Sequence, residues 1–316
     1  MWEDLQSCVR YAISRGAWYS AIQVWRAARL MFFLRGHIAL RKLLSHAQYT
    51  TLIREQPLLP VKYLVPYVAR GLSTRIRRSI LFAHYQFIQR AFRPAFLESV
   101  MRGLPLWCAT IGVHAFRISL DFPFSNTEGD LQLVFRMDAA EVYRLVFVFA
   151  SGGDFNLDAD MVIAITSIQG AQDFDRVKLA TKRCLDIQPA HILMAALGGV
   201  AKATHISNLL GFHGDRQISR CPQLFFSYAN FYANYGEEIA CRKMHHVRFP
   251  YVERPVSHIQ SNHRKRSLRK REFKADIRAE VVNRVSQYLS PAAETEAEVI
   301  GPFRRVLRQT RISPGP

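Results

Sequence analysis

The densest concentration of one kind of side-chain chemistry is a basic run near the end of the chain. Three Lys or Arg side chains stand on each side of Ser267-Leu268; these are Arg264, Lys265, Arg266, Arg269, Lys270 and Arg271. Guanidinium and ammonium groups bind phosphate, and each phosphate that they neutralise releases counterions. No base-reading motif accompanies the run. It therefore predicts contacts with a phosphate backbone or with anionic headgroups, against the alternative of a solvated basic face.

Other residues with potential chemistry are less well supported. The segment Cys241–His246 offers Cys and His four residues apart, but a closed zinc site needs four ligands at recognised spacings, and Arg242 and Lys243 oppose a cation. We therefore predict no metal site. His84 has no recognisable Ser or Cys nucleophile beside it, so we expect a core or interface histidine and no catalytic residue. The aromatic residues of 225–235 could stack on bases, but clustered aromatics are more typical of a core.

The composition indicates a folded, strongly basic protein. The 316 residues are 49% hydrophobic and carry 43 Lys and Arg against 25 Asp and Glu, a formal charge of +18. Such a surplus attracts polyanions, so the expected partner is RNA or an anionic membrane surface; no specific protein partner is indicated. Five scattered cysteines without CxxC spacing, and acids at Glu3 and Asp4 where a signal peptide would carry basic residues, predict a cytoplasmic location. The longest apolar stretch, 192–212, is interrupted by polar residues, so no transmembrane segment is expected.

The first hundred residues are expected to form a basic helical lobe. Apolar residues recur with helical spacing over 18–53 and over 74–92, and Pro57 ends the first of these helices. Residues 1–90 hold fourteen Lys and Arg and three acids. The aromatic residues of this lobe either pack on the rest of the protein or lie at a membrane surface.

Residues 101–262 are expected to form an α+β domain. The predicted strands are 116–122, 131–137, 143–150, 161–168, 206–212 and 246–251. The predicted helices are 173–185, which Asp173 caps, 189–203, which begins at Pro189, and, as a helix or turn, 224–235. Short turns between the first strands indicate an antiparallel meander, and strands followed by helices indicate the α+β class. A basic helical segment at 263–289 and a disordered tail at 290–316 complete the chain.

This order of strands and helices resembles acyltransferases of the GNAT kind. In that fold a Gly-rich turn at a helix N-terminus holds the pyrophosphate of coenzyme A. The corresponding turn would be 169–172, with one glycine, or 187–190, with none and a proline that lacks an N–H. We therefore predict no cofactor and a non-enzymatic protein, and an acyltransferase remains the alternative.

Five segments, in order, resemble the VirK/YbjX family of Gram-negative virulence-associated proteins. They are Arg78–Tyr85, Tyr143–Phe149 with Ile168–Gly170, Ala180–Lys182 with the helix after Gln188-Pro189, Tyr228–Gly236, and Arg264–Arg271. The resemblance covers roughly residues 60–275. The residues that match the family motifs outside the basic run are His84, Tyr85, Gln169, Gly170, Thr181, Lys182, Tyr228, Phe231, Tyr232 and Gly236.

The resemblance implies a cytoplasmic accessory factor that supports the production or surface display of an envelope virulence factor. Two alternatives are a GNAT-like acyltransferase acting on an envelope or protein substrate, and an RNA-binding post-transcriptional regulator. This chain departs from the family at four motif positions. Ala229 and Asn234 stand where the family carries Asp and Glu, Tyr232 replaces Trp, and Glu237 replaces the second Gly. If those two carboxylates perform acid–base chemistry in the family, this chain lacks it.

Overall fold

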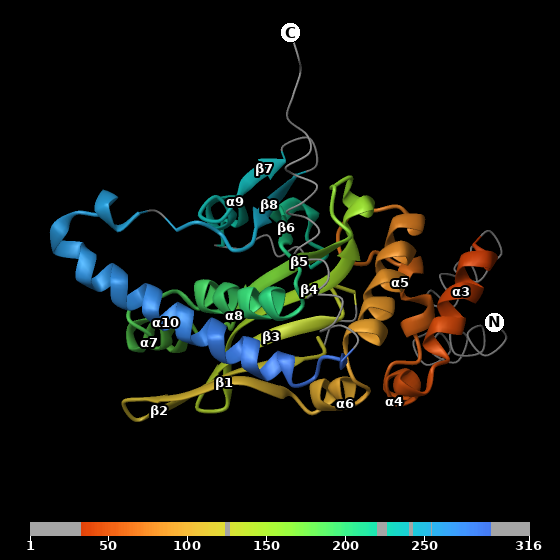
Figure 1. Cartoon of the computed structure of the whole chain (residues 1–316), viewed down its shortest axis with the longest axis horizontal. Coiled ribbons are helices and arrows are strands. Elements are labelled where there is room, and N and C mark those ends of the chain that lie inside the picture. The colour runs from red at the N-terminus through yellow and green to blue at the C-terminus, as the bar shows by residue number, and fades with distance from the viewer. Residues whose placement is uncertain (1–32, 124–126, 220–225, 240–242, 254, 292–316) are drawn as a thin grey trace, which may run out of the picture.

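A computed structural model describes residues 33–123, 127–219, 226–239, 243–253 and 255–291. Helices precede an eight-stranded sheet, which establishes the α+β class expected from the sequence (Figure 1). None of the described helices is long and apolar enough to cross a bilayer. The expected tail at 290–316 lies almost wholly outside the described residues.

The sheet has the strand order β1-β2-β3-β4-β5-β6-β8-β7. Its strands are β1 (Leu104–Ile111), β2 (His114–Asp121), β3 (Leu131–Met137), β4 (Ala140–Ser151), β5 (Met161–Gly170), β6 (Asn208–Phe212), β7 (Glu237–Ile239) and β8 (Met244–Arg248). The strands β2 to β5 form the expected antiparallel meander, and β1, which was not predicted, extends it at one edge. β5 and β6 pair in parallel, and the crossover between them is α7 (Phe174–Arg183) and α8 (Pro189–Ala203).

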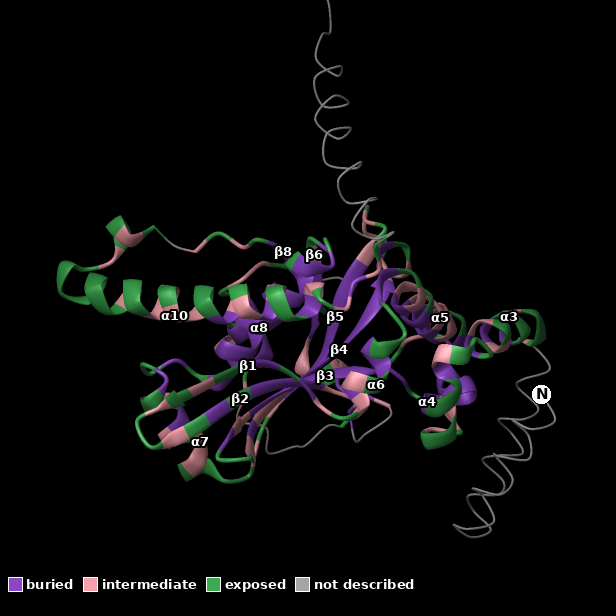
Figure 2. Cartoon of the chain, turned by 60° about the horizontal axis from the view of Figure 1, so that its bottom comes forward, coloured by how far each residue is buried: buried purple, intermediate pink, exposed green. Residues whose placement is uncertain are grey.

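α8 is buried almost all round because it lies between the sheet and α10 (Ser261–Ser286), as Figure 2 shows. Small residues make the helix pair close. A Cβ at Gly199 would lie 2.7 Å from Val281 Cβ and 2.8 Å from the Arg278 carbonyl oxygen. α10 buries only Ile277, Val281 and Val285, which follow one another at intervals of four residues. Its second half is thus anchored, and its first half is not.

The N-terminal helices pack against the sheet through α5 and α6. They are α3 (Leu34–Leu44), η1 (Ala47–Tyr49), α4 (Thr50–Glu55), η2 (Leu59–Leu64), α5 (Thr74–Ala91) and α6 (Ala95–Met101). α5 packs on β4, and its N-terminus is capped by Ser73, whose side chain accepts from Ile76 N. α3 and η2 pack on α5.

Several predicted boundaries were wrong. The expected helix over 18–53 ends at Leu44, because the polar segment Ser45–Gln48 interrupts the apolar spacing; its part before residue 33 lies outside the described residues. β1 was missed, since it contains Pro105 and a bulge that disturbs its alternation. β7 was missed because it is only three residues long. In contrast, 131–137 and 189–203 match β3 and α8 at both ends, and Asp173 caps α7 as predicted.

Candidate functional site

The predicted basic run occupies the unanchored first half of α10. We name residues 261–272 the basic arm. None of its residues is buried, and in Figure 1 it continues past the end of α8. All six predicted cations lie on this one helix, so the run is neither a loop nor a separate short helix. The second half of α10, held by Ile277, Val281 and Val285, fixes the direction of the arm.

One side of the basic arm contacts the loop between α7 and α8. The Arg266 Nη2 atom lies 2.5 Å from Asp186 Oδ2, and Lys270 Nζ donates to the Asp186 carbonyl oxygen at 2.9 Å. Partial burial, followed by the charge of Arg266, lowers the pKa of Lys270. The family-motif residue Lys182 and its neighbour Arg183 are exposed at the end of α7, a few residues before Asp186. The Asp186 carboxylate thus contacts the basic arm, while Lys182 and Arg183 precede it in the chain.

The remaining cations of the arm divide into bound and free groups. Arg271 Nε lies 2.7 Å from Glu253 Oε2, and Lys274 shares that carboxylate. Arg264 donates to the carbonyl oxygens of two residues just before the helix. Lys265 and Arg269 are exposed, and within the described part of the chain neither has an ion pair. The arm thus carries six cations, and the acids beside them are Asp186 and Glu253 from outside the arm and Glu272 within it. This leaves a positive surplus.

The family-motif residues His84 and Tyr85 belong to a fully buried polar network. Lys62 Nζ donates to Asp130 Oδ1 and to the Gly129 carbonyl oxygen, each at 2.8 Å. Tyr85 donates to Asp130 Oδ1 at 3.0 Å, and Tyr67 donates to Oδ2. Asp130 thus accepts three hydrogen bonds. Burial alone would raise its pKa, but the charge of Lys62 and the other neighbouring charge, together with the hydrogen bonds from Lys62 and Tyr67, lower it. The network joins η2, α5 and the segment that enters β3.

His84 lies beside this network and is neutral. Its Nδ1 atom accepts a hydrogen bond from Phe149 N at 3.1 Å, and its buried Nε2 atom has no hydrogen-bond partner in the part of the chain that the structure describes. Burial lowers its pKa to about 4. With 0% of its surface exposed, His84 cannot reach a substrate. The expectation of a core histidine is therefore confirmed.

The motif residues Gln169 and Gly170 lie in β5 and not in a turn at a helix N-terminus. Gln169 accepts from Arg144 at 2.7 Å, and a Cβ at Gly170 would clash with the Tyr143 ring. The glycine is required by packing, and the segment offers no phosphate cradle. Pro189 begins α8, so the second candidate turn lacks the N–H at the first helical position.

The aromatic motif residues form α9 (Tyr228–Tyr232), which covers β6 and β8. Tyr228, Phe231 and Tyr232 are buried, which confirms a core role and leaves none of them to stack on a base. The Tyr228 hydroxyl donates to the Ile168 carbonyl oxygen at 2.8 Å and accepts from Ile168 N at 3.1 Å. A Cβ at Gly236 would lie 2.1 Å from the His246 carbonyl oxygen, so the motif glycine is required where the chain enters β7.

The remaining motif position, Thr181, and three of the four departures from the motif are not buried, whereas the fourth departure, Tyr232, is. Thr181 is half-buried on α7 and donates to the Val177 carbonyl oxygen at 2.8 Å. Ala229, Asn234 and Glu237 are exposed. The two positions where the family carries carboxylates thus face solvent.

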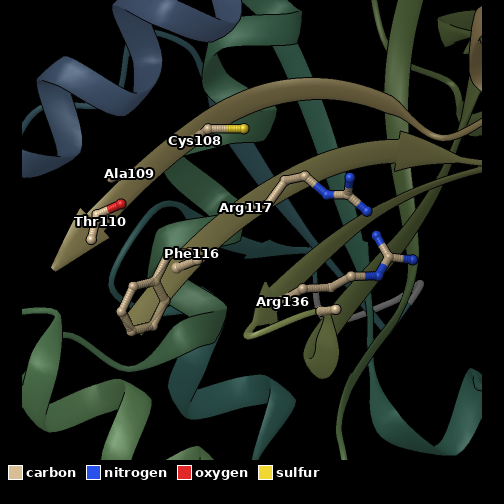
Figure 3. Close-up of a pocket in the computed structure, with 8 residues that line it drawn as sticks. Cys108, Ala109, Thr110, Phe116, Arg117 and Arg136 are labelled. Carbon is tan, nitrogen blue, oxygen red and sulfur yellow. The ribbon is translucent and has the colours of Figure 1, made fainter. Parts of the chain in front are cut away.

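A cavity of about 460 Å³ lies on the face of β1, β2 and β3. Cys108 pairs with Arg117 across β1 and β2, and Arg117 pairs with Arg136 across β2 and β3. Figure 3 shows both guanidinium groups extending to the same side of the sheet. Arg136 is paired with Asp121 at 2.7 Å. Sequence reasoning missed this row, because the strand that contributes Cys108 was itself missed.

Three potential metal ligands come together at the other edge of the sheet. Donor atoms of His213, Glu238 and His245 all lie within 4.8 Å of one another. Sequence reasoning considered His245 only with its neighbours in 241–246. Cys241 lies outside the described residues, and His246 turns to Asn208 at 2.9 Å. No spacing rule connects His213 and Glu238 to His245, since only the sheet brings them together.

A second cavity, of about 430 Å³, lies near the loop after β6 and is lined by Gly71, Asp154, Asn156, Arg216 and Lys243, among others.

A family model described as protein of unknown function (DUF535) matches residues 23–282. The chain belongs to the DUF535 family. No curated protein and no solved structure matches the chain. The VirK/YbjX proteins are known by this family name, so the resemblance is confirmed at the level of the family.

The positions of the motif residues indicate what the DUF535 pattern does in this chain. His84, Tyr85, Tyr228, Phe231 and Tyr232 are buried, and two motif glycines stand where a Cβ would clash. Lys182 and the basic arm are the exposed cationic parts of the motifs. Most of the motif residues therefore hold the fold together, and the surface chemistry of the motifs is positive charge.

Proposed function

We propose that this DUF535 chain is a polyanion-binding accessory protein whose contact surface is the basic arm. The observation that carries the proposal is that residues 261–272 extend from the body without a buried residue, while six Lys and Arg side chains project from them. A helix held at one end by a packed second half offers its charge in a fixed geometry, which reduces the entropy lost on binding.

Phosphate is the group that this surface fits best. Four of the six cations are arginines, whose planar guanidinium groups bind phosphate oxygens through two parallel hydrogen bonds. Leu268, with 44% of its surface exposed, is the arm's one large apolar side chain. Insertion into a bilayer would need a wider apolar face, so membrane contact would use headgroup charge alone. We favour the RNA backbone, with the anionic inner face of the cytoplasmic membrane as the other source of phosphate.

The biological role follows from the family and remains part of this proposal. A cytoplasmic DUF535 protein that binds RNA phosphates can support the production of an envelope virulence factor, whereas one held at the inner membrane can support its display at the surface. Both roles use the same arm. They differ in the anion that binds the arm, which is the RNA backbone in the first role and lipid headgroups in the second.

The proposal is tested by removing Lys265 and Arg269, the two exposed cations of the arm that have neither an ion pair nor a side-chain hydrogen bond with any described residue. Lys265→Gln with Arg269→Gln should weaken binding to single-stranded RNA and should reduce the slope of log affinity against log salt by about 0.7 per lost phosphate contact. Fluorescence anisotropy with labelled RNA at several salt concentrations measures both. Sedimentation with anionic vesicles tests the same variant for binding to a membrane surface.

The matched control is Arg102→Gln with Lys202→Gln, which removes the same charge from exposed positions outside the arm. If the control weakens binding as much as the arm variant, net charge and not the arm drives association. If neither RNA nor vesicles bind the wild-type protein at low salt, the proposed function is wrong.

A second candidate, an acyltransferase, is favoured by the junction of β5 and β6. These parallel strands pair at only three positions, Ile163 to Ile165 with Leu209 to Gly211, while β5 continues to Gly170. The main-chain groups beyond Ile165 lie on an edge where an extended ligand can add. Tyr228 opposes this function, since its hydroxyl already occupies both main-chain groups of Ile168.

Coenzyme A thioesters separate the two candidates. An acyltransferase requires that a millimolar thioester raise the melting temperature of the protein. Tyr228→Phe frees the Ile168 groups and should increase that shift if the edge is the binding site. No shift in either protein eliminates this candidate without affecting the first.

A further inference from the structure

We propose that His213, Glu238 and His245 form a binding site for one divalent transition-metal ion of the zinc class. The three side chains come from the end of β6, from β7 and from β8, which are neighbours in the sheet. Two imidazoles and one carboxylate are the protein ligands of a zinc site that keeps a coordination position open. This inference is independent of the basic arm and of polyanion binding.

The sheet register explains why these residues meet. Glu238 and His245 are direct cross-strand partners on β7 and β8, so their side chains leave the same face. His245 is also opposite Gly211 on β6, and His213 follows two residues later on the same face. Because Gly211 has no side chain, no Cβ separates the two imidazoles, which lie diagonally across the two strands. Their ring centroids are 4.8 Å apart.

The donor atoms are close to the separation that one ion requires. His213 Nε2 lies 3.5 Å from Glu238 Oε1, and all three donors lie within 4.8 Å of one another. Two ligands on a tetrahedral zinc ion, each about 2.0–2.1 Å from the metal, stand roughly 3.4 Å apart. Small side-chain rotations therefore bring the third donor into place without movement of the strands.

A second, independent observation concerns the hydrogen bonding of the His245 ring nitrogens. It is 3% exposed, and neither of its buried nitrogens, Nδ1 and Nε2, has a hydrogen-bond partner among the described residues. Buried polar atoms in native proteins are nearly always paired.

The surroundings close one side of the site and leave the other open. The Tyr232 ring packs over Gly211 and lies 5.5 Å from the His245 ring. The Glu238 side chain is 49% exposed. Lys243, the nearest basic residue in the chain segment before His245, is held by Asp215 at 2.6 Å, which offsets its repulsion of a cation. A bound ion would tie the short edge strand β7 to β6 and β8 and would keep a position accessible to solvent.

The test uses the full chain after dialysis against EDTA. We expect it to take up one equivalent of Co²⁺ with visible absorption typical of nitrogen and oxygen ligands, to bind Zn²⁺ in competition with Co²⁺, and to gain melting temperature with Zn²⁺. Glu238→Gln is the principal variant, because the residue is half exposed and its replacement keeps the size of the side chain. We expect it to weaken Zn²⁺ binding by at least ~10-fold to 100-fold, the loss that even an outer partner of a ligand causes.

His246→Gln is the matched control. It removes a histidine from the same strand, but that side chain lies on the other face and contacts Asn208. The control should bind Zn²⁺ like the wild-type protein, and far-ultraviolet circular dichroism should show that both variants are folded. The chain has 11 histidines, so weak binding elsewhere is expected. If wild type takes up no stoichiometric ion, or if Glu238→Gln and His246→Gln bind equally, the proposal is overturned.

Discussion

The buried network around Asp130 and the basic arm contain the same kind of ionic contact in opposite surroundings. The Lys62 and Asp130 side chains are 4% and 1% exposed, whereas those of Arg266 and Asp186 are 59% and 51% exposed. In the network, every Asp130 contact joins elements that are distant in sequence. In the arm, water and salt compete for each contact, so the cations can exchange an internal carboxylate for an external phosphate. Burial, and not the type of residue, separates structural charge from charge that is available for binding.

The largest expected effect on stability comes from removing one partner of the buried Lys62–Asp130 pair. Lys62→Met leaves the Asp130 carboxylate buried without its cation, and we expect the free energy of unfolding to fall by ~3–5 kcal/mol. Urea denaturation measures the loss. The pair also makes stability depend on pH: since the folded pKa of Asp130 is lowered, its contribution is present above the unfolded value of 3.8 and is lost as pH falls through the folded pKa.

The double variant Lys62→Met with Asp130→Asn sharpens this result. The amide is neutral, and its oxygen still accepts from Tyr67 and Tyr85, so the double variant should be more stable than Lys62→Met alone. If the second substitution instead lowers the free energy of unfolding further, so that the losses from Lys62→Met and Asp130→Asn add, the two residues do not act as one unit.

The next effect is the pH dependence that His84 introduces beside the same network. Its pKa falls from 6.5 when unfolded to about 4 when folded, so between these values the unfolded chain binds more protons. Stability therefore rises with pH from about 4 to 6.5, by ~3 kcal/mol for this residue. His191, whose pKa is also lowered to about 4, contributes in the same direction.

His84→Gln separates the two histidines. The glutamine oxygen can accept from Phe149 N as His84 Nδ1 does, but the side chain does not titrate. Denaturation of both proteins at pH 4.5, 5.5 and 7 should show a smaller rise in stability in the variant. An unchanged rise would mean that His84 is protonated equally in the folded and unfolded chains.

The comparison also explains what the sequence could predict. The segments 74–92 and 189–203 were predicted well, because local signals determine them: helical spacing in the first and Pro189 at the first turn of the second. The basic run was found because its residues are consecutive. Its partners Asp186 and Glu253, and the Lys62–Asp130 pair, were not predicted, since they meet only through the tertiary fold. The same reason hid the relation of His213 and Glu238 to His245: strand register, and not spacing along the chain, brings them together.

The smallest expected effect on stability comes from the exposed pair in the arm. Arg266→Gln removes the contact with Asp186 Oδ2, and because both side chains are more than half exposed, the free energy of unfolding should change by about 0.5 kcal/mol or less. The same variant should weaken binding to RNA, because it removes one cation from the contact surface. Urea denaturation and anisotropy on one preparation measure both quantities. A loss of stability comparable to that of Lys62→Met would mean that the arm contacts are structural, and the distinction between the two regions would then fail.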